Sequence, residues 1–162
     1  MKIQGQHHQG VSFDEPSAQL TILDQTLLPF QIHWLSITTF EQVCFAIAHM
    51  QVRGAPAIGA VAAYGMVFAV KEQRDLFTAA QLLKATRPTA VNLAWAVERM
   101  QKRLAATEKN AHWAIACEEA KAICDEDIAA CSAIGDAGCA LIEAIAKAKH
   151  GATVNILTHC NA

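Results

Sequence analysis

The apolar positions near the N-terminus fall in three short runs of the kind that form β-strands. The runs cover residues 11–13, 20–24 and 31–37. Proline-containing stretches separate the runs and mark turns between them. The pattern predicts a small antiparallel sheet that follows a loose tail over residues 1–10.

From residue 39 onward, apolar residues recur with the spacing of an α-helix. Thr39 and Gln42 form a capping box, and Asp75 is a suitable N-cap for a later helix. The segment 57–70 carries no charge, which predicts a helix buried on all sides. Gly135, with the aspartate after it, is expected to break the helical pattern. The expected helices cover residues 40–51, 56–70, 76–84, 88–105, 110–133 and 137–148.

The last apolar run, residues 153–160, has a β-branched centre that is typical of a buried strand opening a parallel sheet. Cys160 would lie at the carboxyl end of this strand, where open α/β sheets bind ligands. A buried, inert thiol fits the same position. We expect a mainly α fold with a small N-terminal antiparallel β-sheet over residues 1–151, and the first strand of a second domain in residues 152–162.

Two stretches place an arginine shortly before a proline at an expected helix start, Arg53 in 53–59 and Arg87 in 87–93. A cation beside a helix N-terminus opposes the positive end of the helix dipole. An anion held between the arginine and the free N–H groups reverses that effect, and a phosphate suits both partners. Each motif alone also fits a solvated arginine. The repetition points to two helix ends that converge on one phosphate group.

The composition limits the possible partners and compartments. Hydrophobic residues make up 53% of the 162 residues and charged residues 17%, which indicates apolar area meant for a second domain or subunit. The net charge of −2 gives no electrostatic basis for binding nucleic acid or an anionic membrane. The N-terminus has no apolar signal segment, and the longest uncharged run ends at Lys71, short of a membrane span. We therefore expect a cytoplasmic protein.

Cysteines and carboxylates do not predict a metal site. The six cysteines include no Cys-x-x-Cys pair. Cys117, Cys124 and Cys131 are seven residues apart and are interpreted as small apolar side chains on one helical face. The acidic group in 118–127 could hold a metal, but a solvated face is the favoured interpretation because no histidine is adjacent.

Four motifs together resemble the methylthioribose-1-phosphate isomerases, the aldose–ketose isomerases of methionine salvage. The resemblance runs from about residue 20 to the end of the chain, and its last three motifs are specific as a set. The same fold occurs in ribose-1,5-bisphosphate isomerases and in regulatory subunits of the eukaryotic translation-initiation exchange factor. The motifs are Leu23-Asp24-Gln25, Arg53-Gly54-Ala55-Pro56-Ala57-Ile58-Gly59, Arg87-Pro88-Thr89-Ala90-Val91-Asn92-Leu93 and Ile156-Leu157-Thr158-His159-Cys160-Asn161-Ala162.

The resemblance implies that Arg53, Gly54, Ala55 and Arg87 bind a sugar phosphate and that Cys160 acts in the chemistry, without a metal or organic cofactor. It further implies a Rossmann-like C-terminal domain after residue 162 that supplies an essential aspartate, and a homodimer. The chain alone is therefore expected to be inactive. A non-catalytic regulatory subunit of the same fold, a ribose-1,5-bisphosphate isomerase-like enzyme and an inactive truncated product are the alternatives.

Overall fold

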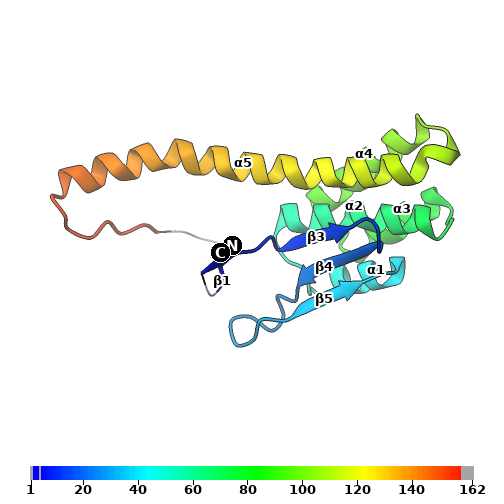
Figure 1. Ribbon diagram of the computed structural model, residues 1–162, viewed down its shortest axis with the longest axis horizontal. Helices are drawn as coiled ribbons and strands as arrows, with labels where there is room; N and C mark the ends of the chain where they lie inside the picture. The colour runs from blue at the N-terminus through cyan, green and yellow to red at the C-terminus, as the bar shows by residue number, and fades with distance from the viewer. Residues whose placement is uncertain (1, 4, 158–162) are drawn as a thin grey trace. The chain divides into compact units, whose positions relative to one another are not determined.

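The computed structural model describes residues 2–3 and 5–157 of the chain (Figure 1). The chain divides into two compact units, Met1–Cys124 and Asp125–Ala162, and α5 runs across the division. The predicted boundary between residues 151 and 152 remains a prediction. In chain order the elements are β1 (Lys2–Ile3), β2 (Gln6–His7), β3 (Val11–Asp14), β4 (Gln19–Leu23), β5 (Trp34–Ile37), α1 (Phe40–Ala48), α2 (Ala55–Lys71), α3 (Leu76–Thr86), α4 (Val91–Ala105), a 3-10 turn (Lys109–Ala111) and α5 (His112–Ala148).

The mainly α fold with a small antiparallel sheet is confirmed. The sheet has the order β3-β4-β5, and both strand pairs are antiparallel. Leu20 and Ile22 of β4 are fully buried, and Phe13 of β3 stacks on Tyr64 of α2 with ring centroids 4.7 Å apart. One face of the sheet therefore closes the core over the helices.

Two details of the N-terminal region differ from the sequence prediction. Residues 1–10 were expected to form a loose tail, but β1 and β2 pair as a small antiparallel hairpin. Gly5 has a φ of 83°, the conformation that a tight turn between two short strands requires. The third strand of the main sheet begins at Trp34 rather than at residue 31, because the N–H of Gln31 bonds to the carbonyl of Leu27 in a turn.

The helical core is centred on α2, which is buried from Ile58 through Ala69. This confirms the prediction from its uncharged sequence. The capping box of Thr39 and Gln42 begins α1, and the carboxylate of Asp75 accepts the N–H of Thr78 at the start of α3, both as predicted.

Two predicted helix boundaries are wrong. Pro88 does not begin a helix: the N–H of Ala90 bonds to the carbonyl of Arg87 in a turn, and α4 starts at Val91. Pro88 fits this turn because its fixed φ suits a turn as well as a helix start. Gly135 does not break the chain either, since α5 continues through it for 37 residues. An interior glycine costs a helix only about 1 kcal/mol relative to alanine, which the rest of α5 offsets.

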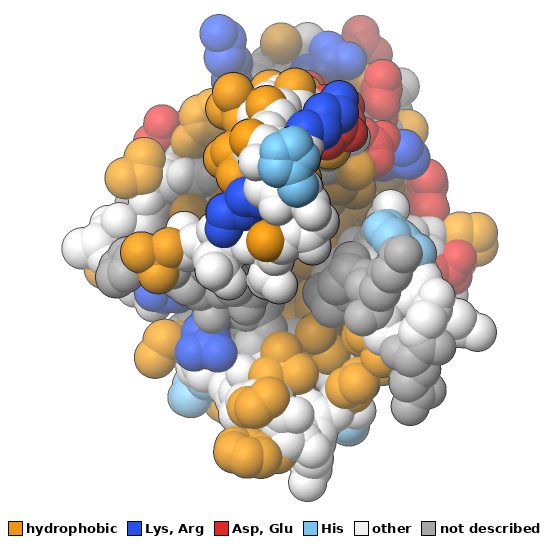
Figure 2. Space-filling model, turned by 90° about the vertical axis from the view of Figure 1, so that its left-hand side faces the viewer, with side chains coloured by type: hydrophobic (Ala, Val, Ile, Leu, Met, Phe, Trp, Pro, Cys, Tyr) orange, Lys and Arg blue, Asp and Glu red, His pale blue; other side chains and the backbone are white. Residues whose placement is uncertain are grey.

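The two parts of α5 differ in burial. Ala116, Cys117, Ala120 and Ile123 are buried in the first unit, whereas no described residue after Asp125 in the helix is buried. Cys131 is exposed, so the predicted core-facing cysteine stripe holds for Cys117 and fails for Cys131. Large apolar side chains such as Ile134 and Leu141 are exposed at 72% and 70%, and hydrophobic surface is visible in Figure 2.

By length and composition, the helical segment Lys109–Ala148 could cross a membrane. Its most apolar window of 18 residues has a mean hydropathy of 1.6, and none of that window is buried. A single such helix is weak evidence, because helices of soluble proteins also pass this test. The expected lack of a membrane role remains a prediction.

The predicted final strand is not formed over its described part. Residues 152–157 have no regular secondary structure, and Ile156 and Leu157 are 67% and 98% exposed. The described chain supplies no neighbouring strand to these residues, so their backbone N–H and C=O groups form no inter-strand hydrogen bonds. The rest of the predicted strand, 158–160, lies outside the described residues.

Candidate functional site

The N-terminus of α2 presents backbone donors without a side-chain cap. Gly54 is the N-cap residue, with φ 95° and ψ 125°, and no side chain bonds to this helix end within the described residues. A residue with a Cβ adopts this backbone conformation only with strain, although the space around Gly54 is open. Pro56 lies in the first turn. The free N–H groups of this turn and the positive end of the helix dipole favour an anion.

Arg53 is tied to Gln25 by two reciprocal hydrogen bonds. The Arg53 guanidinium donates from Nη2 to the Gln25 carbonyl at 3.3 Å, and the Gln25 amide donates from Nε2 to the Arg53 carbonyl at 3.1 Å. The backbone N–H of Gln25 bonds to the carbonyl of Gln51 at 2.9 Å. The arginine is exposed but oriented, because the loop after β4 holds both its side chain and its backbone.

Asp24, directly before Gln25, is 5% exposed and is the buried charged residue of the described core. Its Oδ1 accepts from the N–H and the hydroxyl of Thr26, and its Oδ2 accepts from the Gln51 amide at 3.4 Å. These bonds satisfy a carboxylate that would otherwise be costly to bury. Asp24 and Gln25 belong to the Leu23-Asp24-Gln25 motif, but neither was predicted to act in the site. The available signal was an aspartate directly after an apolar strand.

Arg87 lies in a different setting from the one predicted. It is the C-cap of α3, where a cation suits the negative end of the helix dipole, and it precedes α4 by a turn. Arg87 is half-buried, and among the described residues no carboxylate pairs with its guanidinium or with that of Arg53. Both arginines therefore keep donors for a ligand.

The two arginine motifs meet at Gly59. A Cβ built on this glycine would lie 3.0 Å from the carbonyl oxygen of Asn92. Gly59 is near the N-terminal end of α2, and Asn92 is the second residue of α4. Only a residue without a side chain allows the two backbones to approach so closely. The structure thus brings the N-terminal turns of α2 and α4 together, which combines two positive helix ends.

Other titratable groups lie outside this region. Burial raises the pKa of the Cys44 thiol to about 11 and that of Cys117 to about 12, with Glu41 and Glu15 adding to the two effects. These thiols are protonated and unreactive at neutral pH. Cys160 lies outside the described residues. No group of three metal-binding side chains occurs within the part of the chain that the structure describes.

Hollows of the first unit lie away from the arginines. One of about 750 Å³ and one of about 710 Å³ share Val70 and Gln73 at the C-terminal end of α2. A third of about 500 Å³ lies between α1 and α3 and is lined by Cys44, Phe45 and Leu82 among others. None of these three is lined by Arg53 or Arg87. Arg53, Gly54 and Ala55 are themselves exposed.

A family model described as the initiation factor 2 subunit family matches residues 51–162, which include both arginine motifs. The chain belongs to this family.

Curated relatives carry the name methylthioribose-1-phosphate isomerase. The protein of Acidiphilium cryptum is 46% identical over 166 residues, and that of Methylorubrum extorquens is 42% identical over 165 residues. Each match covers 100% of this chain and 45% of the relative. The relative from Gluconobacter oxydans is 48% identical over 153 residues, with 91% of this chain and 41% of the relative covered. The chain thus spans about half the length of the relatives it matches.

Two solved structures share the fold. The 5-methylthioribose 1-phosphate isomerase of Pyrococcus horikoshii has a TM-score of 0.65 at 32% identity, over 72% of this chain and 36% of that one. The translation initiation factor eIF-2B subunit delta of A. fulgidus has a TM-score of 0.69 at 32% identity, over 75% of this chain and 38% of that one. Both an isomerase and an initiation-factor subunit are therefore similar to this chain in fold.

Proposed function

We propose that this chain forms the N-terminal part of an aldose–ketose isomerase that converts 5-methylthioribose 1-phosphate to 5-methylthioribulose 1-phosphate. The contact of Gly59 with Asn92 carries the proposal, because it joins two positive helix ends beside two arginines that pair with no carboxylate of the described residues. A dianionic phosphate monoester matches that charge. The relatives named for this activity support the choice of sugar phosphate.

In this proposal the described residues bind and orient the substrate. Arg53 and Arg87 bind the phosphate with the N–H groups of Gly54 and Ala55, and the clamped phosphate fixes the sugar for reaction. The phosphate blocks the anomeric oxygen, so the ring must open before hydrogen moves between C1 and C2. Cys160 would assist that proton or charge movement. A C-terminal domain beyond residue 162 would complete the site.

Titration of methylthioribose 1-phosphate into the chain tests the phosphate site. Arg53→Ala and Arg87→Ala should each weaken binding by about 1.5–3 kcal/mol, the cost of a charge-assisted contact. Lys102→Ala is the control, because it removes an exposed cation from α4 elsewhere. If both arginine variants bind like the parent, the proposed site is wrong.

A non-catalytic subunit of the same fold is the second candidate, and the similarity to the initiation-factor subunit favours it. An activity assay on the chain mixed with the C-terminal half of a curated relative distinguishes the isomerase from the non-catalytic subunit. Turnover that Cys160→Ser abolishes supports the isomerase, whereas sugar phosphate binding without turnover supports the subunit. Preference for ribose 1,5-bisphosphate in the same assay would indicate the related isomerase instead.

We further propose a homodimer in the complete protein and a cytoplasmic location without membrane or nucleic-acid partners. The exposed apolar side chains of α5 support an apolar partner surface. The net charge of −2 gives no attraction to nucleic acid. Sedimentation of the complete protein and its distribution between membrane and supernatant fractions test these points.

A further inference from the structure

We propose that Gln25, held by the buried Asp24, is a positioning residue that sets both the Arg53 guanidinium and the Gly54 N–H for phosphate. The inference rests on the proposed phosphate site and goes further, because it assigns a function to the loop after β4. Gln25 contributes its backbone carbonyl and its side-chain amide to Arg53, so one residue controls two parts of the site.

The geometry of a single peptide links Gln25 to the helix end. The Arg53 carbonyl and the Gly54 N–H belong to one peptide unit and point in opposite directions, because that bond is trans. The Gln25 amide holds the carbonyl at 3.1 Å. The Gly54 N–H is thereby turned away from Gln25. The φ of 95° at Gly54 then begins α2 directly from this fixed peptide.

The hydrogen bond from the Arg53 side chain to Gln25 orients the guanidinium and leaves most of its N–H donors free to bind a ligand. Nη2 donates to the Gln25 carbonyl at 3.3 Å, which takes one of the five guanidinium N–H donors. The remaining donors stay available for phosphate oxygens. A long flexible side chain loses rotamer freedom when it binds a ligand, and a preformed contact reduces that loss.

Asp24 anchors the Gln25 clamp, the two hydrogen bonds between Gln25 and Arg53, to the core. Its Oδ1 binds the N–H of Thr26 and its Oδ2 binds the Gln51 amide, while the Gln25 N–H binds the Gln51 carbonyl. The loop of Gln25 and the loop that leads into Arg53 are therefore tied together by two hydrogen bonds to Gln51. Gln25 itself is half-buried, so its side chain can be changed without opening the core.

The test compares Gln25→Met with Gln19→Met in the 162-residue chain, with inorganic phosphate as the probe. Gln19 is the matched control, because its amide donates to the Ser36 hydroxyl at 3.1 Å on the same sheet. NMR follows the Gly54 amide signal without phosphate, and the Gly54 and Ala55 amides during titration. Gln25→Met keeps the backbone carbonyl that accepts from Arg53 Nη2 and removes the amide bond to the Arg53 carbonyl. It should therefore move the Gly54 amide signal before phosphate is added and weaken phosphate binding about two- to tenfold, the effect of one hydrogen bond. Gln19→Met should do neither.

A swapped pair gives a second test that a simple loss of stability cannot imitate. Asp24→Asn should weaken phosphate binding, because its new NH₂ faces the Gln51 amide and two donors oppose each other. Gln51→Glu in the same chain restores an acceptor and should return binding to within about twofold of the parent. Unfolding temperatures of the variants show whether any loss of binding follows from unfolding.

The outcomes separate this inference from the proposed function. If phosphate shifts the Gly54 and Ala55 amides equally in the parent and in Gln25→Met, the positioning role is wrong and the phosphate site stands. If phosphate shifts neither amide in the parent, the phosphate site itself is wrong and the positioning role falls with it. An unmoved Gly54 amide signal in phosphate-free Gln25→Met would show that the Gln25 amide does not set the peptide before Gly54.

Discussion

At the residue scale, the surroundings of a glycine decide what a methyl group would cost. A Cβ added to Gly59 would lie 3.0 Å from the backbone oxygen of Asn92. A Cβ added to Gly138 would have no described atom within 4 Å outside its own stretch of helix. Both residues are in helix interiors. Their difference therefore isolates the contact between α2 and α4 from the general helix propensity of glycine.

We predict that Gly59→Ala lowers the free energy of unfolding by about 1–3 kcal/mol, the range for overpacking a tight contact. Gly138→Ala should instead leave stability unchanged or raise it by up to about 1 kcal/mol. Urea unfolding followed by circular dichroism measures both. Equal effects in the two variants would contradict the close approach of the helix ends.

We predict that exposed cysteines react with a thiol reagent faster than buried ones. The pKa values of Cys44 and Cys117 are raised to about 11 and about 12, so roughly one Cys44 thiol in a thousand is ionised at pH 8. Cys131 and Cys139 are exposed and should react first with a thiol reagent. Peptide mass spectrometry over time gives the order, and early labelling of Cys117 would contradict it.

The same shifts predict a loss of stability at high pH. A folded-state pKa raised above the ordinary value of 9.0 favours the neutral thiol, so its contribution to stability is complete below pH 9. It falls as the pH rises from 9 through about 11 and 12. Cys44→Ala and Cys117→Ala should each reduce this part of the alkaline loss.

Residue types alone predicted some helix boundaries and caps, but not the surroundings of Arg87 or the contact of Gln25 with Arg53. The helix start at Pro56 and the cap at Asp75 follow from local chemistry, and both are correct. Arg87 could not be placed, because its proline fits a turn and a helix start equally well. The Gln25 clamp spans 28 residues of sequence and follows from tertiary packing alone.

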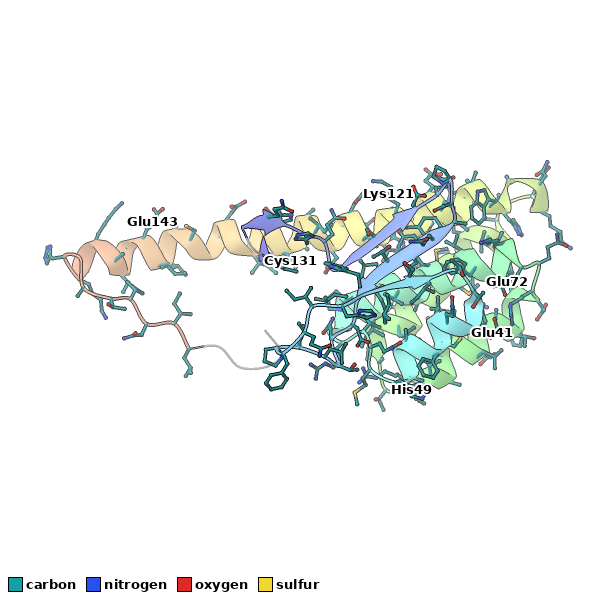
Figure 3. The ribbon with its side chains drawn as sticks, turned by 60° about the horizontal axis from the view of Figure 1, so that its bottom comes forward. Glu41, His49, Glu72, Lys121, Cys131 and Glu143 are labelled. Atoms are coloured by element: carbon teal, nitrogen blue, oxygen red, sulfur yellow. The ribbon has the colours of Figure 1, made fainter. Side chains whose placement is uncertain are left out.

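At the scale of elements, the end of α2 supports the start of α1. Glu72 is the C-cap of α2. Its carboxylate accepts one hydrogen bond from the backbone N–H of Phe40 at 2.9 Å and another from Nε of Arg74 at 2.6 Å. Arg74 also pairs with Glu41, and Figure 3 shows Glu41 and Glu72 at the same part of the helical layer. A negative charge is favourable at the N-terminus of α1.

We predict that Glu72→Gln destabilises the chain more than Glu98→Gln. The Glu72 side chain is 24% exposed and accepts hydrogen bonds from the Phe40 backbone and the Arg74 guanidinium. We expect Glu72→Gln to lower the free energy of unfolding by about 1–3 kcal/mol. Glu98 is 64% exposed as a side chain and, within the part of the chain that the structure describes, forms an ion pair with Lys84 at 2.8 Å. The loss in Glu98→Gln should therefore stay below about 1 kcal/mol. Equal midpoints in urea would show that the cap of α1 does not need Glu72.

The elements themselves were largely predictable, and α5 shows the limit. Its apolar spacing was correct on both sides of Gly135, but the glycine was interpreted as a helix end. Many helices end with a residue of positive φ, after which the chain turns away. Positive φ occurs instead at His150 and Gly151, just after the end of α5.

At the scale of the whole molecule, the proposed function assigns the described residues a binding surface rather than a complete site. The donors near Gly54 and Arg53 lie on an open surface, and catalysis generally needs a site that excludes water. We predict that the purified 162-residue chain shows no isomerase activity on methylthioribose 1-phosphate. The matched positive control is the same chain with the C-terminal half of a curated relative. Turnover by the chain alone would contradict the prediction.

The segment after α5 gives the last prediction. Ile156 and Leu157 are apolar, 67% and 98% exposed, and belong to a stretch without strand pairing. An apolar segment with free backbone groups is protected only when another chain or domain pairs with it. In a dilute monomer their amides should therefore exchange with solvent at the rate of an unstructured peptide.

Buried core amides provide the internal control for that measurement. Ile47 and Val67 are fully buried within helices and should be protected under the same conditions. Protection of Ile156 and Leu157 that appears only as the protein concentration rises would show that a second chain completes the strand. Strong protection in a demonstrated monomer would mean that the chain satisfies this segment internally, and the need for a further domain at this point would be refuted.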